Sequence, residues 1–427
     1  MSAACEAPTG WTKRRLRFDA SLNPQKSKLD LPADTEVSFV RMESLGEYGG
    51  LTLNETRPIE EVYNGYTYFA DGDVCIAKIT PCFENGKGAL ARGLANGVAF
   101  GTTELHVIRP LSNLDARFLF YLTNAHDFRS FGEAEMLGAG GQKRVPEEFL
   151  KDWRAPLPPP ETQRRIVRFL DEKTARIDAL IEKKRALLDR LAEKRQALIT
   201  RAVTKGLNPD APLKPSGIEW LGDIPAHWEV VALNKVTTKI TNGYVGPTRD
   251  IFVPEGVRYI QSLHIKSNRI VFKDDFFVSE EWSEEHAKSI LKLDDVLIVQ
   301  TGDIGQVAHV TSEHVGCNCH ALIVCSPDSQ SVSGKYLSWL FCSGYGQQFL
   351  NLVKTGALHP HLNCGNVKFF NVLIPPFDEQ VAIATAIAEH VDAYEKIAAR
   401  VAQSIDRLAE YRAALITAAV TGRLEVA

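Results

Sequence analysis

Two short patches of the sequence hold residue types that can bind a metal ion. They contain His314, Cys317, Cys319 and His320 in HVGCNCHA, and His359, His361 and Cys364 in HPHLNC. A structural zinc site usually draws on a second pair of ligands at a distance, and neither patch has an obvious one. Cys317, Cys319 and Ala321 also alternate along the chain, as residues on a strand do. The sequence therefore favours a structural role for both patches and predicts no metal site.

Motifs for nucleotide hydrolysis and for methyl transfer are incomplete. CFENGKG (82–88) contains a Gly-Lys pair but lacks the earlier glycine of a G-x-x-x-x-G-K-[ST] phosphate loop. A methyltransferase acting on a base amino group needs Asn or Asp before Pro-Pro-aromatic, whereas Ile374 precedes Pro-Pro-Phe and Leu157 stands at the matching place. No G-x-G loop follows a strand in a β-α-β setting, and no nuclease constellation is evident. We expect no catalytic residue and no cofactor on this chain.

Basic, amide and hydroxyl side chains in loops are the remaining candidates, and these types read base edges and bind phosphates. In the first half they are Lys78, Thr80, Asn85, Lys87, Arg92, Gln142, Lys143 and Arg144. In the second half they are Asn242, Tyr244, Arg249, Lys266, Asn268, Arg269, Gln300, Thr301, Gln306, His359 and His361. Lys78 aligns with Gln300, and LGAGGQKR aligns with TGALHPH. Because the candidates recur at matching places, the set predicts double-stranded DNA as the ligand.

A repeated phrase indicates which elements position these side chains. DRLAEKRQALITRAVT (189–204) returns as DRLAEYRAALITAAVT (406–421), with 13 of 16 residues identical at an offset of 217. The similarity extends without a gap over 157–207 and 374–424. So long a match at one fixed offset indicates a tandem duplication.

Each copy of the repeat predicts one long helix. A Pro-Pro pair sets an extended backbone before it, and Glu161 or Asp378 follows where an acidic residue favours a helix N-terminus. Gly206 and Gly422 are the expected stops. The first helix then covers about 45 residues, or roughly 67 Å at 1.5 Å per residue.

An apolar seam with seven-residue spacing runs along each predicted helix. It contains Leu170, Ile177, Lys184, Leu191 and Leu198 in the first copy, and Ile387, Tyr394, Val401, Leu408 and Leu415 in the second. A supporting row contains Ile166, Leu180, Leu187 and Ile199, then Ile383, Val391, Ile397, Ile405 and Ile416. Such a stripe must be buried along its length. We predict that the helices pair as an antiparallel coiled coil with a pseudo-two-fold relation; the alternative is that each packs on its own module. Lys184 either extends its ammonium to solvent or fixes the register.

The segments before the two helices match in frame, although their loops diverge. DGDVCIAKI (71–79) resembles LDDVLIVQT (293–301), and both predict strands bounded by turns. Stretches 116–132 and 334–351 predict helices. The fold class is therefore α+β, with two tandem α/β modules and two long helices. The expected domains are 1–154, a first helix at 155–207, a second module at 208–372 with a linker at 208–227, and a second helix at 373–427.

Composition narrows the class of protein further. Of the 427 residues, 44% are hydrophobic and 24% are charged, as in ordinary globular chains. No apolar run approaches about 20 residues and the N-terminus lacks a signal-peptide core, so we expect a cytoplasmic protein that does not span a membrane. The net charge of −4 neither requires nor excludes DNA. Residues 161–205 include 13 basic and 7 acidic side chains, a local excess that can attract phosphates or a partner.

Motif order and duplication together resemble those of type I restriction-modification specificity subunits. KITPCFENGKGA and GTTELHVIRP resemble the first target-recognition domain of some members, and WLGDIPAHWEVVALNKV resembles the usual opening of the second. The two long helical segments are similar to the central and distal conserved regions of that family. The resemblance covers essentially the whole chain.

The resemblance implies a non-catalytic subunit of a larger complex. Each target-recognition domain would read one half of a bipartite DNA site, and the paired helices would set the spacer between the halves. Two methylation subunits would dock on the helices and methylate an adenine in each half, and restriction subunits would join that core. S-adenosylmethionine, ATP and magnesium are then expected on those partners and not on this chain.

Two other functions remain as alternatives to DNA recognition. A coiled-coil scaffold with degenerate modules would have loops stripped of basic and amide residues, and these loops are not stripped. A self-sufficient methyltransferase or nuclease is disfavoured by the missing motifs.

Overall fold

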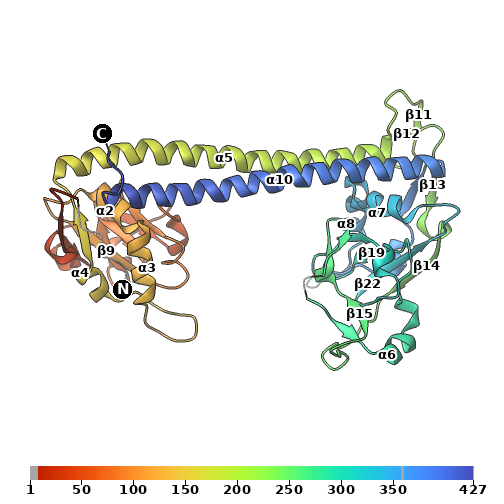
Figure 1. Ribbon diagram of the computed structural model, residues 1–427, viewed down its shortest axis with the longest axis horizontal. Helices are drawn as coiled ribbons and strands as arrows, with labels where there is room; N and C mark the ends of the chain where they lie inside the picture. Colours follow the sequence, from red (N-terminus) through yellow and green to blue (C-terminus); the bar gives the residue numbers. More distant parts are fainter. Residues whose placement is uncertain (1–7, 273, 357–359, 427) are drawn as a thin grey trace. The chain divides into compact units, whose positions relative to one another are not determined.

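The computed structural model describes residues 8–272, 274–356 and 360–426 and divides the chain into two compact units. Unit 1 consists of Met1–Arg185 with Ala402–Ala427, and unit 2 consists of Ala186–Val401. Each unit contains part of both long helices, α5 (Pro160–Lys205) and α10 (Phe377–Val420), drawn in yellow-green and blue in Figure 1. The long helices are therefore shared between the units, and this division cuts across the domain limits expected from the sequence.

Unit 1 is built on two four-stranded sheets with the strand orders β2-β9-β6-β7 and β4-β3-β8-β5. Strands β3 and β8 pair in parallel, and the other neighbours pair antiparallel. The strands are β1 (Thr12–Arg15), β2 (Ala20–Leu22), β3 (Glu36–Val40), β4 (Thr56–Pro58), β5 (Thr67–Ala70), β6 (Val74–Ala77), β7 (Gly88–Leu90), β8 (Val98–Gly101), β9 (Leu105–Pro110) and β10 (Arg154–Leu157). The short helices are α1 (Ile59–Val62), α2 (Ala116–Thr123), α3 (His126–Ala134) and α4 (Glu147–Asp152).

Unit 2 repeats this plan with a four-stranded sheet β14-β22-β19-β20 and a three-stranded sheet β18-β15-β21, in which β15 and β21 pair in parallel. The strands of the larger sheets are β14 (Thr237–Asn242), β15 (Val257–Ile260), β18 (Phe277–Val278), β19 (Val296–Val299), β20 (Val307–His309), β21 (Asn318–Cys319) and β22 (Leu322–Pro327). Paired short strands are β11 (Leu213–Pro215) with β12 (Asp223–Pro225), β13 (Glu229–Ala232) with β23 (Asn371–Ile374), and β16 (Ile265–Lys266) with β17 (Arg269–Ile270). The helices are α6 (Glu280–Glu285), α7 (Gly334–Cys342), α8 (Gly344–Leu352) and α9 (Cys364–Val367).

Both units have the same layers, because one central strand contributes to two cores. Val74 and Ile76 of β6 pack in the core that includes α2 and the long helices, whereas Cys75 packs against the second sheet. In unit 2, Val296 and Ile298 of β19 face the helices while Leu297 and Val299 face the other sheet. Burial on both faces explains why VCIA and VLIV are continuous apolar runs.

The duplication is visible in strand register. Strand β1 pairs antiparallel with β10 so that Thr12 lies opposite Leu157, and β13 pairs with β23 so that Glu229 lies opposite Ile374. Both partners are displaced by the same 217 residues between the two units. The two halves therefore fold into equivalent structures, although their loops differ in sequence.

A buried glutamine fixes the start of each long helix. The amide nitrogen of Gln163 donates to the carbonyls of Pro158 and Asn113, and its oxygen accepts from the backbone N–H of Asp115, the N-cap of α2. Gln380 makes the matching bonds to Pro375, Ser331 and the N-cap Ser333 of α7. Each glutamine thus joins a long helix to the short helix beside it.

The long helices end as the glycines predict. Helix α5 ends at Lys205 and α10 ends at Val420, and Gly206 and Gly422 adopt positive φ angles of 75° and 72°. A Cβ added at Gly206 would lie 3.3 Å from the ring of Trp228, and one added at Gly422 would lie 3.3 Å from the ring of Trp11. These close contacts, like the φ angles, select glycine.

The predicted seam is buried or half-buried at every position. Within unit 1, Asp178 of α5 pairs with Arg412 of α10 at 2.8 Å, and within unit 2, Arg195 pairs with Glu395 at 3.7 Å. Seventeen residues further along α5 thus correspond to seventeen earlier along α10, so the helices pair antiparallel. Their ends also pack in the module cores, so both predicted modes of burial occur.

Part of the predicted supporting row was wrong. Leu180, Leu187 and Ile397 are 43%, 43% and 47% exposed, whereas Ile181 is 9% exposed and joins the core of unit 1. The period of a straight helix drifts from seven-residue spacing, and the buried face includes Ile181 in place of Leu180. Lys184 is half-buried.

The stretches 116–132 and 334–351 each form two helices instead of one. Helices α2 and α3 are separated at Asn124–Ala125, and α7 and α8 at Ser343. The breaks matter because the N-terminus of the second helix in each pair then faces a long helix. In the part of the chain that is described, no helix combines the length and the apolar character that crossing a membrane requires.

Candidate nucleic-acid interface

Two segments of unit 1 that are far apart in sequence form one surface. They are the β6–β7 loop (78–87) and the Gly-rich hairpin (137–144). The N–H of Val145 donates to the carbonyl of Lys78 at 2.8 Å, and the N–H of Thr80 donates to that of Lys143 at 3.0 Å. Leu137 and Arg144 close the hairpin through two backbone bonds of 2.9 and 2.8 Å. The structure therefore brings seven of the eight candidates of this half together.

The side chains on this surface divide into free and engaged groups. Asn85, Gln142 and Lys143 are exposed. Lys87 donates to the carbonyl of Met42 at 3.4 Å, and the Thr80 hydroxyl donates to the Lys143 carbonyl at 3.2 Å. The exposed group is suited to contact an external ligand, whereas the engaged group holds the loop.

Arg144 is neutralised by a carboxylate of its own unit. Its guanidinium donates two hydrogen bonds to Glu104, at 2.9 and 2.8 Å. These bonds hold the pKa of Glu104 below its ordinary value and raise the pKa of Arg144. Such a bidentate pair fixes geometry, so Arg144 anchors the hairpin and Lys143 is its exposed cation.

Arg92 is not part of this surface. It is exposed two residues after β7 ends, whereas Lys87 immediately precedes the strand. The two side chains therefore stand at opposite ends of β7.

Unit 2 has an equivalent surface built from the β19–β20 loop (300–306) and the hairpin that Thr355 and His361 close. The N–H of Leu362 donates to the carbonyl of Gln300 at 3.0 Å, as Val145 does to Lys78. Thr355 and His361 exchange backbone bonds of 2.9 and 2.8 Å, as Leu137 and Arg144 do. This match supports the alignment of Lys78 with Gln300.

The candidates on this second surface differ in chemistry from those of unit 1. Thr301 and Gln306 are exposed, and Gln300 is half-buried. Its buried side-chain oxygen has no hydrogen-bond partner among the described residues. His361 is half-buried and its ring lies 3.2 Å from the Thr355 hydroxyl. His359 lies outside the described residues. Amide and hydroxyl groups therefore dominate here, where unit 1 offers lysines.

Four further candidates of unit 2 are used inside the protein. Asn268 is 8% exposed and donates to the Ser338 hydroxyl at 3.0 Å, so its prediction as a base reader was wrong. Arg269 pairs with Asp392 and Glu395 of α10. Asn242 accepts a hydrogen bond from the Cys364 thiol at 2.8 Å, and Tyr244 packs edge-on against Trp282 and His286. Spacing alone did not reveal these partners.

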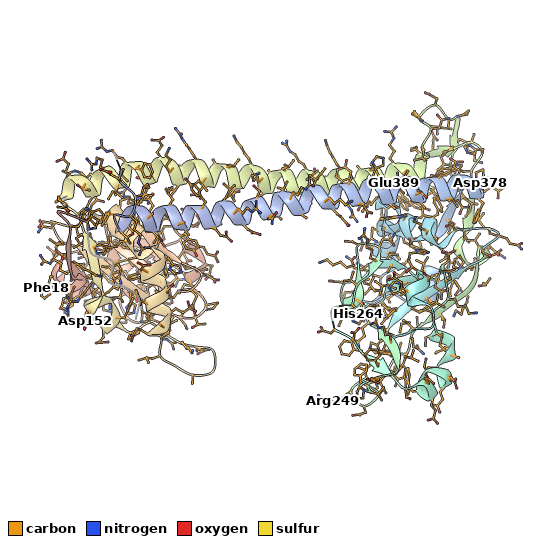
Figure 2. The ribbon with its side chains drawn as sticks, in the orientation of Figure 1. Phe18, Asp152, Arg249, His264, Asp378 and Glu389 are labelled. Atoms are coloured by element: carbon orange, nitrogen blue, oxygen red, sulfur yellow. The ribbon has the colours of Figure 1, made fainter. Side chains whose placement is uncertain are left out.

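Lys266 and Arg249 remain exposed in unit 2. Figure 2 shows Arg249 at the end of the unit remote from α10, where Asp378 and Glu389 are labelled. Both cations can contact a phosphate, but Arg249 stands apart from the β19–β20 loop.

The Cys and His patches are packed, not arranged around an ion. Cys317 and Cys319 lie in the core of unit 2. Burial raises the pKa of the Cys319 thiol to about 12 and that of Cys364 to about 11, so both thiols stay protonated. Among the residues that the structure describes, no group of three or more His, Cys, Asp and Glu side chains is placed to hold a metal ion.

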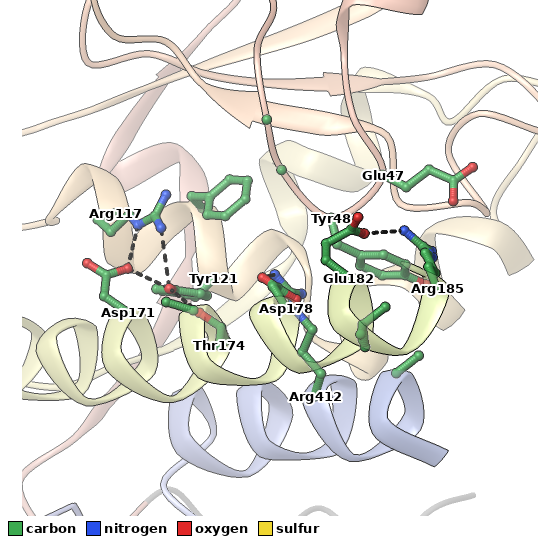
Figure 3. Close-up of a pocket in the computed structure, with 16 residues that line it drawn as sticks. Glu47, Tyr48, Arg117, Tyr121, Asp171, Thr174, Asp178, Glu182, Arg185 and Arg412 are labelled. Carbon is green, nitrogen blue, oxygen red and sulfur yellow. Dashed lines mark hydrogen bonds and ion pairs between the residues drawn. The ribbon is translucent and has the colours of Figure 1, made fainter. Parts of the chain in front are cut away.

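A polar cavity of about 600 Å³ in unit 1 lies where α2 meets both long helices (Figure 3). Arg117 pairs with Asp171, Arg412 with Asp178 and Arg185 with Glu182, at 2.8, 2.8 and 2.7 Å. All three arginines that line it are thus ion-paired. The cavity is a junction between the module and the helices, with its cations already neutralised.

Sequence reasoning missed three residues that support the surfaces from below. His106 is buried and its Nε2 lies 2.8 Å from the Val145 carbonyl, and burial lowers its pKa. Arg129 of α3 and Gln347 of α8 donate to carbonyls of the two loops. Arg129 and Gln347 fall at corresponding places in the aligned helical stretches 116–132 and 334–351, which was the signal available for them.

Two equivalent loop surfaces, each carried by a duplicated α+β unit that includes both long helices, define a protein with two different recognition surfaces. The model of the type I restriction modification DNA specificity domain family matches residues 18–190 and 225–405. The chain belongs to this family.

Known proteins agree with this assignment. The type I restriction enzyme EcoEI specificity subunit of Escherichia coli is 43% identical over 164 residues, which are 38% of this chain and 27% of that protein. A solved structure described as concerning complex assembly and conformational transition of the type I R-M system aligns over 98% of this chain and 100% of its own, with a TM-score of 0.77 and 17% identity. The HsdS subunit from Thermoanaerobacter tengcongensis aligns over 99% of both chains, with a TM-score of 0.54 and 17% identity. The two structures share the fold of this chain.

Proposed function

We propose that the chain is the non-catalytic DNA-recognition subunit of a type I restriction-modification complex. Unit 1 and unit 2 each bind one half of a bipartite site on double-stranded DNA. The observation that carries the proposal is the pair of equivalent loop surfaces with different exposed side chains. Equivalent frames address two similar features of a duplex, and different side chains read different bases.

The exposed chemistry of the two surfaces supports this role. Lys143 suits a phosphate, while Asn85, Gln142, Thr301 and Gln306 suit base edges or the sugar-phosphate backbone. A scaffold without DNA readout would not need two exposed sets of amide side chains on equivalent loops. The scaffold alternative is therefore the weaker one.

The long helices present a surface for two copies of one partner. Leu180 and Ile397 are separated by the 217-residue offset and are 43% and 47% exposed. Equivalent apolar side chains on two helices fit two identical methylation subunits, which would supply S-adenosylmethionine and the reactive groups. Restriction subunits, with their ATP and magnesium, would join that core. The helices in turn would set the spacer between the half-sites.

Mapping N6-methyladenine across a genome in which this chain is co-expressed with its methylation subunit tests the proposal. We expect one motif with two dissimilar halves and a gap of about half a helical turn or slightly more. Omitting this chain is the control and should abolish that motif. An unbroken palindrome, or no motif from a methylation subunit shown to be active with another specificity subunit, would contradict the proposal.

A further inference from the structure

We infer that Arg129 and Gln347 are positioning residues that hold the β6–β7 loop and the β19–β20 loop in place for base readout and tie them to the long helices. The inference rests on the proposed function and adds residues outside the loops to the determinants of specificity. It is carried by contacts that recur in both units although the residues that make them differ.

The same loop position is clamped in each unit. Nη1 of Arg129 donates to the carbonyl of Phe83 at 3.0 Å, and Nε2 of Gln347 donates to the carbonyl of Gly305 at 2.8 Å. Phe83 stands five residues after Lys78, and Gly305 stands five residues after the aligned Gln300. The two helix residues therefore hold equivalent points of the two loops.

Packing between helix and loop is also matched, with the large and small residues exchanged. In unit 1 the loop supplies Phe83 and the helix supplies Gly132, at which an added Cβ would lie 2.5 Å from the Phe83 ring. In unit 2 the loop supplies Gly305 and the helix supplies Leu350, whose methyl would lie 3.8 Å from a Cβ added at Gly305. Each loop is thus fitted to its own helix, and interchange of loops alone would leave a clash or a void.

Arg129 brings a buried charge as well as a clamp. It is 9% exposed, and its acceptors are two neutral oxygens, the Phe83 carbonyl and the Asn124 side chain. Burial lowers its pKa to about 10, so it remains protonated at neutral pH. Burying a charge without a carboxylate is costly, and the neutral Gln347 clamps the other loop without that cost. A cation beneath the loop adds positive potential on the side that would meet phosphates.

The clamps begin one helical turn from the long helices. The hydroxyl of Thr417 accepts from the first N–H of α3, at His126, and Arg129 follows three residues later. In unit 2 the hydroxyl of Thr200 accepts from Gly344 of α8, and Gln347 again follows three residues later. A shift of either long helix is therefore passed through one turn to the loop.

The test uses the complete complex of this chain with its methylation subunit and genome-wide mapping of methylated adenine. Arg129→Ala should raise methylation at sites with a mismatch in one half on the order of tenfold, since a misplaced contact loses about 1–3 kcal/mol of discrimination. The other half should stay strict. Gln347→Ala should relax the half that Arg129→Ala leaves unchanged. Arg129→Gln keeps a donor and should restore most of the discrimination.

A general loss of structure would relax both halves together or abolish methylation. Equal relaxation of both halves, or no relaxation by Arg129→Ala or Gln347→Ala in an intact complex, overturns the inference. If Arg129→Ala does not assemble, the half-specific effect of Gln347→Ala decides. Failure of the unaltered chain to give any bipartite motif would instead contradict the proposed function, so the two failures are distinguishable.

Discussion

The hydroxyl of Thr417 accepts a hydrogen bond from the backbone N–H of His126 at 2.9 Å, across 291 residues of sequence. Thr200 is the matching residue of the first repeat, and its hydroxyl accepts from the N–H of Gly344 at 2.7 Å. The end of α10 thus caps a helix in unit 1, and the end of α5 caps a helix in unit 2. This exchange gives the repeated phrase a purpose beyond the seam.

Replacing Thr417 by Val should destabilise unit 1 by about 1 kcal/mol, the usual cost of losing a helix cap. The apolar seam would keep its shape, because valine is close to threonine in volume. Urea unfolding followed by circular dichroism measures the change. Thr417→Ser keeps the acceptor and is the matched control. Equal stabilities of the two variants would show that the bond contributes nothing.

The seam and the two long helices could be predicted because they depend on local periodicity. Leu170 and Ile387 are fully buried, as their spacing indicated. The role of Thr417 could not be predicted, because its partner is an N–H of another helix and no spacing rule connects them. The same holds for Asn268, whose amide looks like a base reader in the sequence and contacts Ser338 in the structure.

Lys143→Ala should weaken DNA binding by the complex about equally for every sequence. The exposed cation suits a phosphate, so its loss should reduce the slope of log affinity against log salt by about one. Titration of the complex with duplexes at several salt concentrations measures both effects. Gln142→Ala on the same hairpin is the control and should leave the salt slope unchanged. An unchanged slope for Lys143→Ala would remove this lysine from the phosphate contacts.

Stability should fall as the pH is lowered from 7 to 5, in part because of His106. Burial lowers its pKa in the folded state, so below the ordinary value of about 6.5 the unfolded chain binds the proton first. The contribution is complete above that value and is lost as the pH falls towards the folded pKa. Burial shifts His264, His314 and His320 in the same direction.

Urea midpoints between pH 8 and pH 5 test this prediction for the chain and for His106→Gln. The glutamine amide can still donate to the Val145 carbonyl, so the variant should lose less stability on acidification than the unaltered chain. His126→Gln replaces a side chain that is 77% exposed and serves as the control. An identical pH dependence for His106→Gln and the unaltered chain would contradict the assignment.

Removing residues 183–189 of α5 together with 401–407 of α10 should shorten the spacer of the DNA site. Seven residues correspond to about 10 Å of helix, or about three base pairs. The matched deletion leaves Asp178 facing Arg412 and Arg195 facing Glu395, whereas deletion from α5 alone would misalign one pair. Methylation mapping should give the same two half-sites with a smaller gap. An unchanged gap would mean that the helices do not set it.

The position of the loops was predictable from the sequence, but the fate of each side chain was not. Lys143 and Arg144 are neighbours with similar chemistry, yet Glu104 takes up the guanidinium and leaves the ammonium exposed. Glu104 stands forty residues away in a different loop. Whether a cation is free depends on such distant partners, which one sequence does not reveal.

The division of the chain has a consequence for the order of folding during synthesis. Unit 2 is continuous over Ala186–Val401, whereas unit 1 needs Ala402–Ala427 to complete its core. Leu415, Ile416 and Val420 of that last segment pack with Leu16 and Phe118 near the start. The half that leaves the ribosome first must therefore wait, with an apolar face open, until the second half has been made. The N-terminal unit is then the last to finish and the more exposed to chaperones and proteases.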